Sequence, residues 1–91
     1  MKPEIKQLLD AAFEHVVAVY GHKGYQFWRD LIGDQINFLY PDEKGKQVEV
    51  MPLWDEKPDG RIRVVVAILA VSILREPTKC FFVNQDGSVA T

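Results

Sequence analysis

The sequence is poor in cysteine: Cys80 is the single thiol among 91 residues. One cysteine excludes a disulfide within the chain, and it also excludes a metal site built from several thiolates. Proteins without disulfides are typical of reducing compartments. We therefore expect a cytoplasmic protein.

The chain also has no large excess of positive or negative charge. The chain carries 11 Lys and Arg residues against 13 Asp and Glu residues, which gives a formal net charge of −2. Nucleic-acid-binding proteins usually gather basic residues into a patch or stripe, whereas here the basic residues are scattered along the chain. We therefore expect no nucleic-acid partner.

Long apolar runs are missing as well. The longest such stretch covers residues 64–74 and is interrupted by Ser72, whereas a membrane-spanning helix needs about 20 apolar residues. The first residues, Met1 to Glu4, lack the apolar core of a signal peptide. These features predict a soluble protein with no membrane partner.

The length suits a single domain, which we place over residues 1–91. A domain of this size buries only about 60–65% of the surface that its unfolded chain exposes. Its stability margin is therefore small, and burial against a partner subunit would increase it.

The N-terminal segment has the clearest pattern. Its apolar residues recur at spacings of three and four, which is typical of one face of a helix. Pro3 suits the first helical turn, and Gly21 favours a stop in the left-handed conformation. We predict an amphipathic helix over residues 3–20. The apolar stripe consists of Ile5, Leu8, Leu9, Ala12, Phe13, Val16, Val17 and Tyr20.

A shorter helix is predicted over residues 25–32. Its apolar residues, among them Tyr25, Trp28 and Leu31, would share one face, and Gly33 would end it. Aromatic residues also suit strands, so a strand is the alternative for this segment.

From residue 35 the apolar pattern changes to a period of about 2, as in a strand. We predict strands over residues 35–40 and 48–54, with a turn over residues 41–45 between them. Pro52 lacks an amide donor, so the second strand is predicted to be an edge strand or to bulge there. Residues 55–60 contain a Pro-Asp-Gly run and are predicted to connect a hairpin.

The segment from Arg61 to Ala70 is rich in β-branched residues, and we predict that it is the central strand. A helix over residues 64–75 is the alternative. The pattern leaves open whether residues 70–78 continue the strand or turn into a helix, although Pro77 favours a turn.

The C-terminal part predicts a hairpin. Residues 79–83 form a strand, residues 84–87 form a tight turn that ends in Asp-Gly, and residues 88–90 pair back as a short edge. The whole chain is therefore predicted to be an α+β domain. An N-terminal amphipathic helix and a short second helix would pack on a four- to five-stranded antiparallel sheet.

The candidate chemical groups lack the neighbours that catalysis or metal binding requires. His15 and His22 have no third ligand at a recognisable spacing, and a metal site needs three or four. The thiol of Cys80 would need a nearby base, but Lys79 would point to the opposite face of a strand. We expect surface histidines and a cysteine that packs as a small apolar residue.

The acidic hairpin is the remaining candidate for a cation site. Asp55, Glu56 and Asp59 lie close together in sequence but lack the ligand spacing of a calcium loop. Solvated turn residues are the better interpretation. We therefore predict a protein that is not an enzyme and has no metal or cofactor.

The predicted central strand is apolar on both faces beyond Arg63. Antiparallel sheets normally leave one face polar, so the second face, with Val65 and Leu69, needs a cover. The second helix, the C-terminal segment or another subunit would provide it. An uncovered apolar face is typical of an interaction surface.

Three further residues are candidates for an interaction or ligand surface. Trp28 and Arg29 are residue types that are common at binding hot spots, although Trp28 shares the inward face of its helix and core packing is favoured. Trp54, at the end of a strand, either caps the core or lies exposed.

These patterns give two functional hypotheses. The first is a protein-interaction or regulatory module that forms a homodimer or binds a protein partner. The alternative is a small-ligand-binding domain, with a pocket between helix and sheet lined by Tyr20, Tyr25, Trp28 or Trp54.

Overall fold

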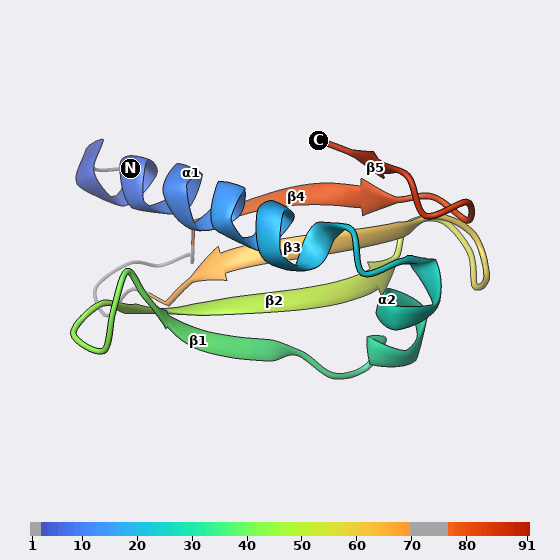
Figure 1. Ribbon diagram of the computed structural model, residues 1–91, viewed down its shortest axis with the longest axis horizontal. Helices are drawn as coiled ribbons and strands as arrows, with labels where there is room; N and C mark the ends of the chain where they lie inside the picture. Colours follow the sequence, from blue (N-terminus) through green and yellow to red (C-terminus); the bar gives the residue numbers. More distant parts are fainter. Residues whose placement is uncertain (1–2, 70–76) are drawn as a thin grey trace.

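The computed structural model describes residues 3–69 and 77–91. The chain forms helical segments first and then five strands in one sheet (Figure 1). The helical segments are α1 (Pro3–Val16), the π-helical turn η1 (Val17–Gly21) and α2 (Tyr25–Leu31). The strands are β1 (Ile36–Tyr40), β2 (Lys46–Trp54), β3 (Ile62–Ile68), β4 (Thr78–Val83) and β5 (Val89–Ala90). The predicted α+β class is confirmed.

The sheet has the order β1-β2-β3-β4-β5, and every neighbouring pair is antiparallel. Each strand therefore pairs with the next one along the chain, as short connections favour. The predicted central position of β3 is confirmed, and the alternative helix beginning at residue 64 is wrong over Val64–Ile68. The question about residues 70–76 lies outside the described residues.

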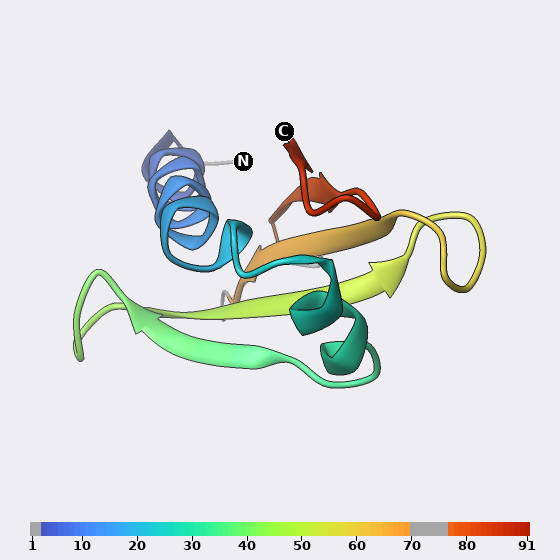
Figure 2. The same ribbon diagram turned by 45° about the vertical axis from the view of Figure 1, so that its right-hand side comes forward.

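Both helices pack on the same face of the sheet (Figure 2). The ring of Phe81 in β4 lies at the centre of this contact. Its centroid is 5.9 Å from that of Phe13 in α1 and 5.8 Å from that of Trp28 in α2. Both pairs meet edge to face, which is a favourable aromatic geometry. We call this side the helix face, and the opposite side the outer face.

The core fills the space between the helices and the helix face. The predicted stripe of α1 is confirmed, because Leu9, Ala12, Phe13 and Val16 are buried. The sheet supplies alternate residues of each central strand, as a period of about 2 requires. These are Val48, Val50, Pro52, Ile62, Val64, Val66, Ile68, Phe81 and Val83.

Gly21 ends the first helical segment, but it does not adopt the left-handed conformation that was predicted for it. The left-handed conformation occurs at Gly24, Gly33 and Gly87, not at Gly21. Gly21 is instead buried at the end of η1, where an added Cβ would lie 3.4 Å from Val17 and 4.0 Å from Val89. Gly33 ends α2 as predicted, with a φ of 91°.

The expectation that Pro52 marks an edge strand or a bulge is wrong. β2 lies between β1 and β3, and Pro52 pairs in register with Val64. The amide of Asp55 donates to the carbonyl of Arg61 at 3.0 Å, so the odd-numbered residues of β2 bond to β3. The backbone nitrogen of Pro52 therefore points toward the β1 side of β2, but β1 pairs with β2 only as far as Val50. The missing N–H of Pro52 therefore removes no hydrogen bond between strands.

Among the described residues, no helix is long and apolar enough to span a membrane.

Candidate functional site

The structure separates the five predicted surface residues into two groups. Trp28, Arg29 and Trp54 belong to the helix side, whereas Val65 and Leu69 lie on the outer face, because they alternate with the buried residues of β3. The structure therefore does not bring the five together in one site.

Trp28 is fully buried in the core and presents no surface to a partner. Its Nε1 is the one buried side-chain nitrogen or oxygen among the described residues without a hydrogen-bond partner. The indole stands at 90° to the ring of Phe27 and at 80° to that of Phe81. Such edge-to-face contacts place the positive edge of one ring against the negative face of another, so Trp28 is a packing residue.

Arg29 is exposed on α2, and its contacts are within the chain. The Arg29 Nε donates to Asp59 Oδ1 at 2.8 Å, and the hydroxyl of Tyr25 donates to the carbonyl of Gly60 at 2.6 Å. Both bonds hold α2 against the β2–β3 connection. Trp54, at the end of β2, is half-buried beside the core, opposite Ile62.

The outer face is apolar across several strands. Val65 pairs with Met51 on one side and with Cys80 on the other, and all three side chains are half-buried. The described residues include four exposed large apolar side chains, and three of them lie here: Leu39, Leu53 and Leu69. Large apolar side chains that are exposed on one face of a sheet are typical of an interaction surface.

Neither helix covers this face, because both lie on the other one. The C-terminal segment does not cover it either, since β5 pairs with the edge of β4 and extends the sheet. Among the described residues, neither of the two covers predicted from within the chain therefore lies over the second face of β3.

Sequence reasoning missed part of this surface. Leu39, Met51, Leu53 and Phe82 were not among the predicted site residues, yet they lie on the same face as Val65. The signal that identifies them is the strand register. A residue is on the outer face if it pairs with an outward residue of the neighbouring strand, and pairing is not visible in one strand's own pattern.

A charged cluster closes one end of the outer face. The carboxylate of Asp55 accepts hydrogen bonds from Arg61 Nη2 at 2.5 Å and from Arg63 Nη2 at 3.0 Å. These two guanidinium groups, that of Arg61 first, hold the pKa of Asp55 below its ordinary value. Two cations share one anion here, so this end keeps one positive charge.

A carboxylate lies near the middle of this face. Glu49 pairs with Ala67 in β3 and accepts a hydrogen bond from Gln35 Nε2 at 3.1 Å. An amide donor leaves the charge of the carboxylate in place. Leu39 and Leu69 flank Gln47 and lie beyond Glu49, so Glu49 stands between them and the level of Met51 and Val65.

The remaining candidate groups stand apart from this surface or lack partners. His15 packs its ring against Phe38 and Tyr40, at centroid distances of 5.7 and 5.3 Å. Cys80 is half-buried on the outer face, whereas Lys79 points to the helix face. Among the described residues, no group of three or more His, Cys, Asp or Glu side chains is placed to hold a metal ion.

The acidic hairpin is more ordered than a solvated turn. Asp55 is bound by the two arginines and Asp59 by Arg29, so both carboxylates act within the chain. This is a structural role: the three ion pairs hold the β2–β3 connection to the end of the sheet and to α2.

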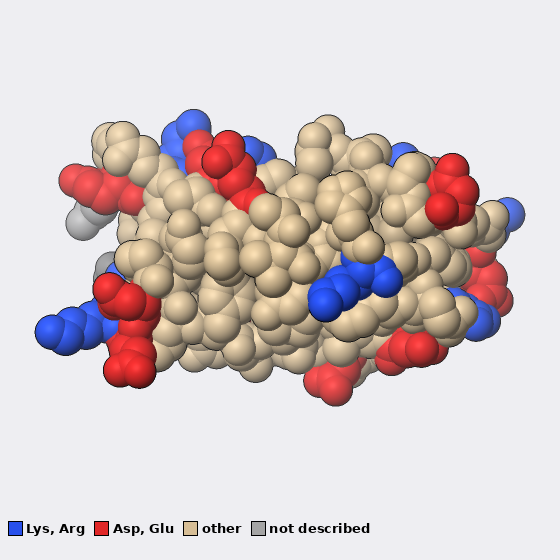
Figure 3. Space-filling model, in the orientation of Figure 1, with Lys and Arg blue, Asp and Glu red and all other residues tan. Residues whose placement is uncertain are grey.

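The helix side is also poor in charge at its centre. Figure 3 views this side, and the charged groups lie mostly around its rim, apart from one basic group nearer the middle. Val19 on η1 is the fourth exposed large apolar residue. A groove of about 440 Å³ lies on this side between α1 and β4. None of Tyr20, Tyr25, Trp28 and Trp54 lines it.

Comparison of the chain with protein-family models, with curated proteins and with solved structures gave no match. The function is therefore argued from the geometry alone.

Proposed function

We propose that this chain is a protein-interaction module that forms a homodimer through the outer face of its sheet. The observation that carries the proposal is the arrangement of both helices on one face, while Leu39, Leu53 and Leu69 remain exposed on the other. Burial of this apolar surface against a second copy would supply free energy that a domain of 91 residues has little of.

The charges of the outer face favour a second copy. Most homodimers have a two-fold axis, so that the same patch serves on both subunits. We place the two-fold axis in the interface, perpendicular to the strands and level with Met51 and Val65. The strands of the second copy then run opposite to those of the first. This axis places Glu49 of one copy over Leu53 of the other. Because Leu53 pairs with Arg63, the Glu49 carboxylate of each copy then lies near Arg63 of the other copy.

The oligomeric state tests the proposal directly. We expect the wild-type chain to elute as a dimer in size-exclusion chromatography with light scattering. Leu53→Glu should shift it to a monomer, because the new carboxylate would be buried against the Glu49 carboxylate of the other copy. Val19→Glu is the matched control: Val19 is 47% exposed and Leu53 is 49% exposed, but Val19 lies on the helix side.

A charge exchange tests the orientation of the two copies. Glu49→Arg and Arg63→Glu should each weaken the dimer, and the double variant should restore it in part. A wild-type monomer at the highest soluble concentration would overturn the homodimer. Equal dissociation by Leu53→Glu and Val19→Glu would remove the outer face as its interface.

A further inference from the structure

The edge of β4 is open over most of its length. β3 pairs with β4 over Thr78–Val83, but β5 pairs with it at Phe82 and Val83 only. Among the described residues, Thr78–Phe81 therefore have no strand on the β5 side. Figure 2 shows β5 as a short segment at the edge of a longer β4.

The ladder shows which backbone groups face this open edge. The amide of Ile68 donates to the carbonyl of Pro77 at 3.1 Å, and the amide of Asn84 donates to the carbonyl of Ser88 at 2.9 Å. Antiparallel strands direct alternate residues to alternate sides. The N–H and C=O groups of Thr78 and Cys80 therefore point away from β3, in line with those that Phe82 directs toward β5.

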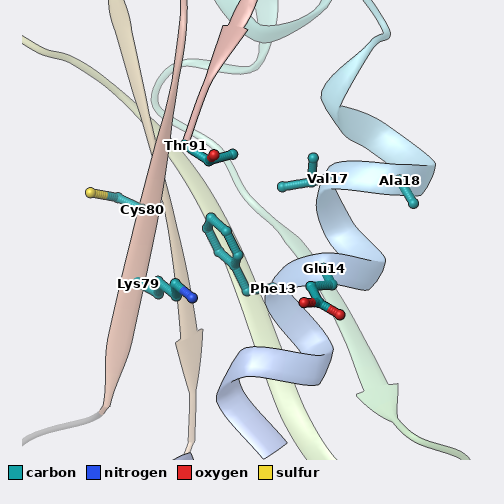
Figure 4. Close-up of a pocket in the computed structure, with 7 residues that line it drawn as sticks. All are labelled: Phe13, Glu14, Val17, Ala18, Lys79, Cys80 and Thr91. Carbon is teal, nitrogen blue, oxygen red and sulfur yellow. The ribbon is translucent and has the colours of Figure 1, made fainter.

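The groove of about 440 Å³ lies beside this edge. Figure 4 shows Val17 and Ala18 of the helix on one wall, Lys79 and Cys80 of β4 on the other, and Thr91 at one end. The Cys80 sulfur points away from the groove, so the backbone of β4 forms part of the wall. A strand that continued the line of β5 past Thr91 would enter the groove.

The charges beside the groove balance. Lys79 Nζ lies 3.3 Å from Asp10 Oδ1 and 4.7 Å from the ring centroid of Phe13. Asp10 also pairs with Lys6 at 3.2 Å, and Glu14 adds a second carboxylate from the same helix. Two cations therefore stand against two anions, and the apolar contact that Phe13 and Val17 supply decides what the groove would accept.

We propose that this groove binds an extended polypeptide segment with an apolar side chain opposite Lys79, which adds to β4 as an antiparallel strand. The N–H and C=O groups of Thr78 and Cys80 would form its hydrogen bonds. The guest residue opposite Lys79 would direct an apolar side chain toward Phe13 and Val17, because it shares the helix face with Lys79. Main-chain bonds with a side-chain pocket are the usual basis of strand addition.

A second copy of β4 does not fit this edge. The register of β4 and β5 places Thr91 opposite Phe81. If two copies of β4 paired as antiparallel strands, a residue of the second β4 would have to occupy the position opposite Phe81, where Thr91 already lies. The groove is thus distinct from the outer-face interface, and the two proposals can fail separately.

Extending the chain tests the strand addition, since tethering supplies the segment at a high effective concentration. Three residues, Thr-Val-Thr, are appended after Thr91, so that the first and third face Cys80 and Thr78. We expect hydrogen exchange at the amides of Thr78 and Cys80 to slow by about tenfold, the effect of one to two net backbone hydrogen bonds.

Two matched extensions serve as controls. Pro-Val-Pro keeps the apolar side chain and the carbonyl acceptors but lacks the two N–H donors that face β4, so it loses half of the added hydrogen bonds and should protect less than Thr-Val-Thr. Thr-Asn-Thr keeps the backbone donors but replaces the apolar side chain that would contact Phe13 and Val17, and it should also protect less. No slowing with Thr-Val-Thr, or equal slowing with Pro-Val-Pro, would overturn strand addition. Equal slowing with Thr-Asn-Thr would overturn the apolar contact.

Discussion

The two faces of β3 present the same residue type in different surroundings. Val64 and Val66 are fully buried beneath the helices, whereas Val65, between them, is half-buried and Leu69 is 41% exposed. The apolar side chains on the two faces are similar in size and hydropathy. The difference teaches that the burial of a large apolar strand residue depends on whether another element covers its face, although the small Ala67 on the outer face is fully buried.

The largest expected effect distinguishes the two faces through adjacent phenylalanines. Phe81→Ala should lower the free energy of unfolding by about 3–5 kcal/mol, because it leaves a cavity among buried rings. Phe82→Ala should cost only about 1 kcal/mol, since Phe82 is half-buried beneath the Arg61 guanidinium, 4.2 Å from its ring centroid. Urea denaturation measures both.

The comparison is cleanest in a chain that does not dimerise. Both substitutions are therefore made in the Leu53→Glu background, so that loss of the interface does not add to the cost of Phe82→Ala. Similar costs for the two phenylalanines would mean that the outer face is covered within the monomer.

A smaller effect is expected at the charged end of the outer face, and it depends on pH. Because Arg61 and Arg63 lower the pKa of Asp55, its carboxylate stabilises the fold above the ordinary carboxyl pKa. This contribution is lost as the pH falls through the lowered pKa. Asp55→Asn should therefore be less stable than the wild type at neutral pH, and thermal melts should converge in acid.

The matched control for this pH dependence is Asp30→Asn. Asp30 is exposed on α2 and accepts a hydrogen bond from Gln26 Nε2 at 2.7 Å, which is not an ionic contact. A wild-type advantage over Asp55→Asn that persisted unchanged into acid would contradict the assigned role of Asp55.

The smallest effect is expected on the helix side, at the ion pair between Arg29 and Asp59. Exposed ion pairs contribute about 0.2–1 kcal/mol, so Arg29→Ala should lower the free energy of unfolding by no more than that. A double-mutant cycle with Asp59→Ala measures the pair itself. A coupling larger than this range would mean that α2 depends on Arg29 for its position.

Much of the fold could be predicted because it follows from local patterns. The stripe of α1 requires a period of about 3.6, Gly33 ends α2 through its positive φ, and the β-branched run of β3 favours a strand. The role of Pro52 could not be predicted, because it depends on where β1 begins relative to β2. The relative positions of β1 and β2 are set by the tertiary structure.

The candidate site was less predictable than the fold. Val65 and Leu69 could be placed on the second face of β3 from alternation alone. Leu53 and Phe82 could not, since their place beside Val65 and Arg63 follows from strand register. Tryptophan is a residue type that is common at binding surfaces, but the burial of Trp28 depends on how α2 packs against Phe81.

The sequence by itself determined that β3 has two apolar faces, because alternation along an extended chain is a local property. Only the tertiary structure decided which face is the core. Both helices lie on the side of Phe81, and no feature of β3 itself distinguishes that side from the other. The physical reason is that burial depends on the atoms that a face meets, and those atoms come from distant parts of the chain.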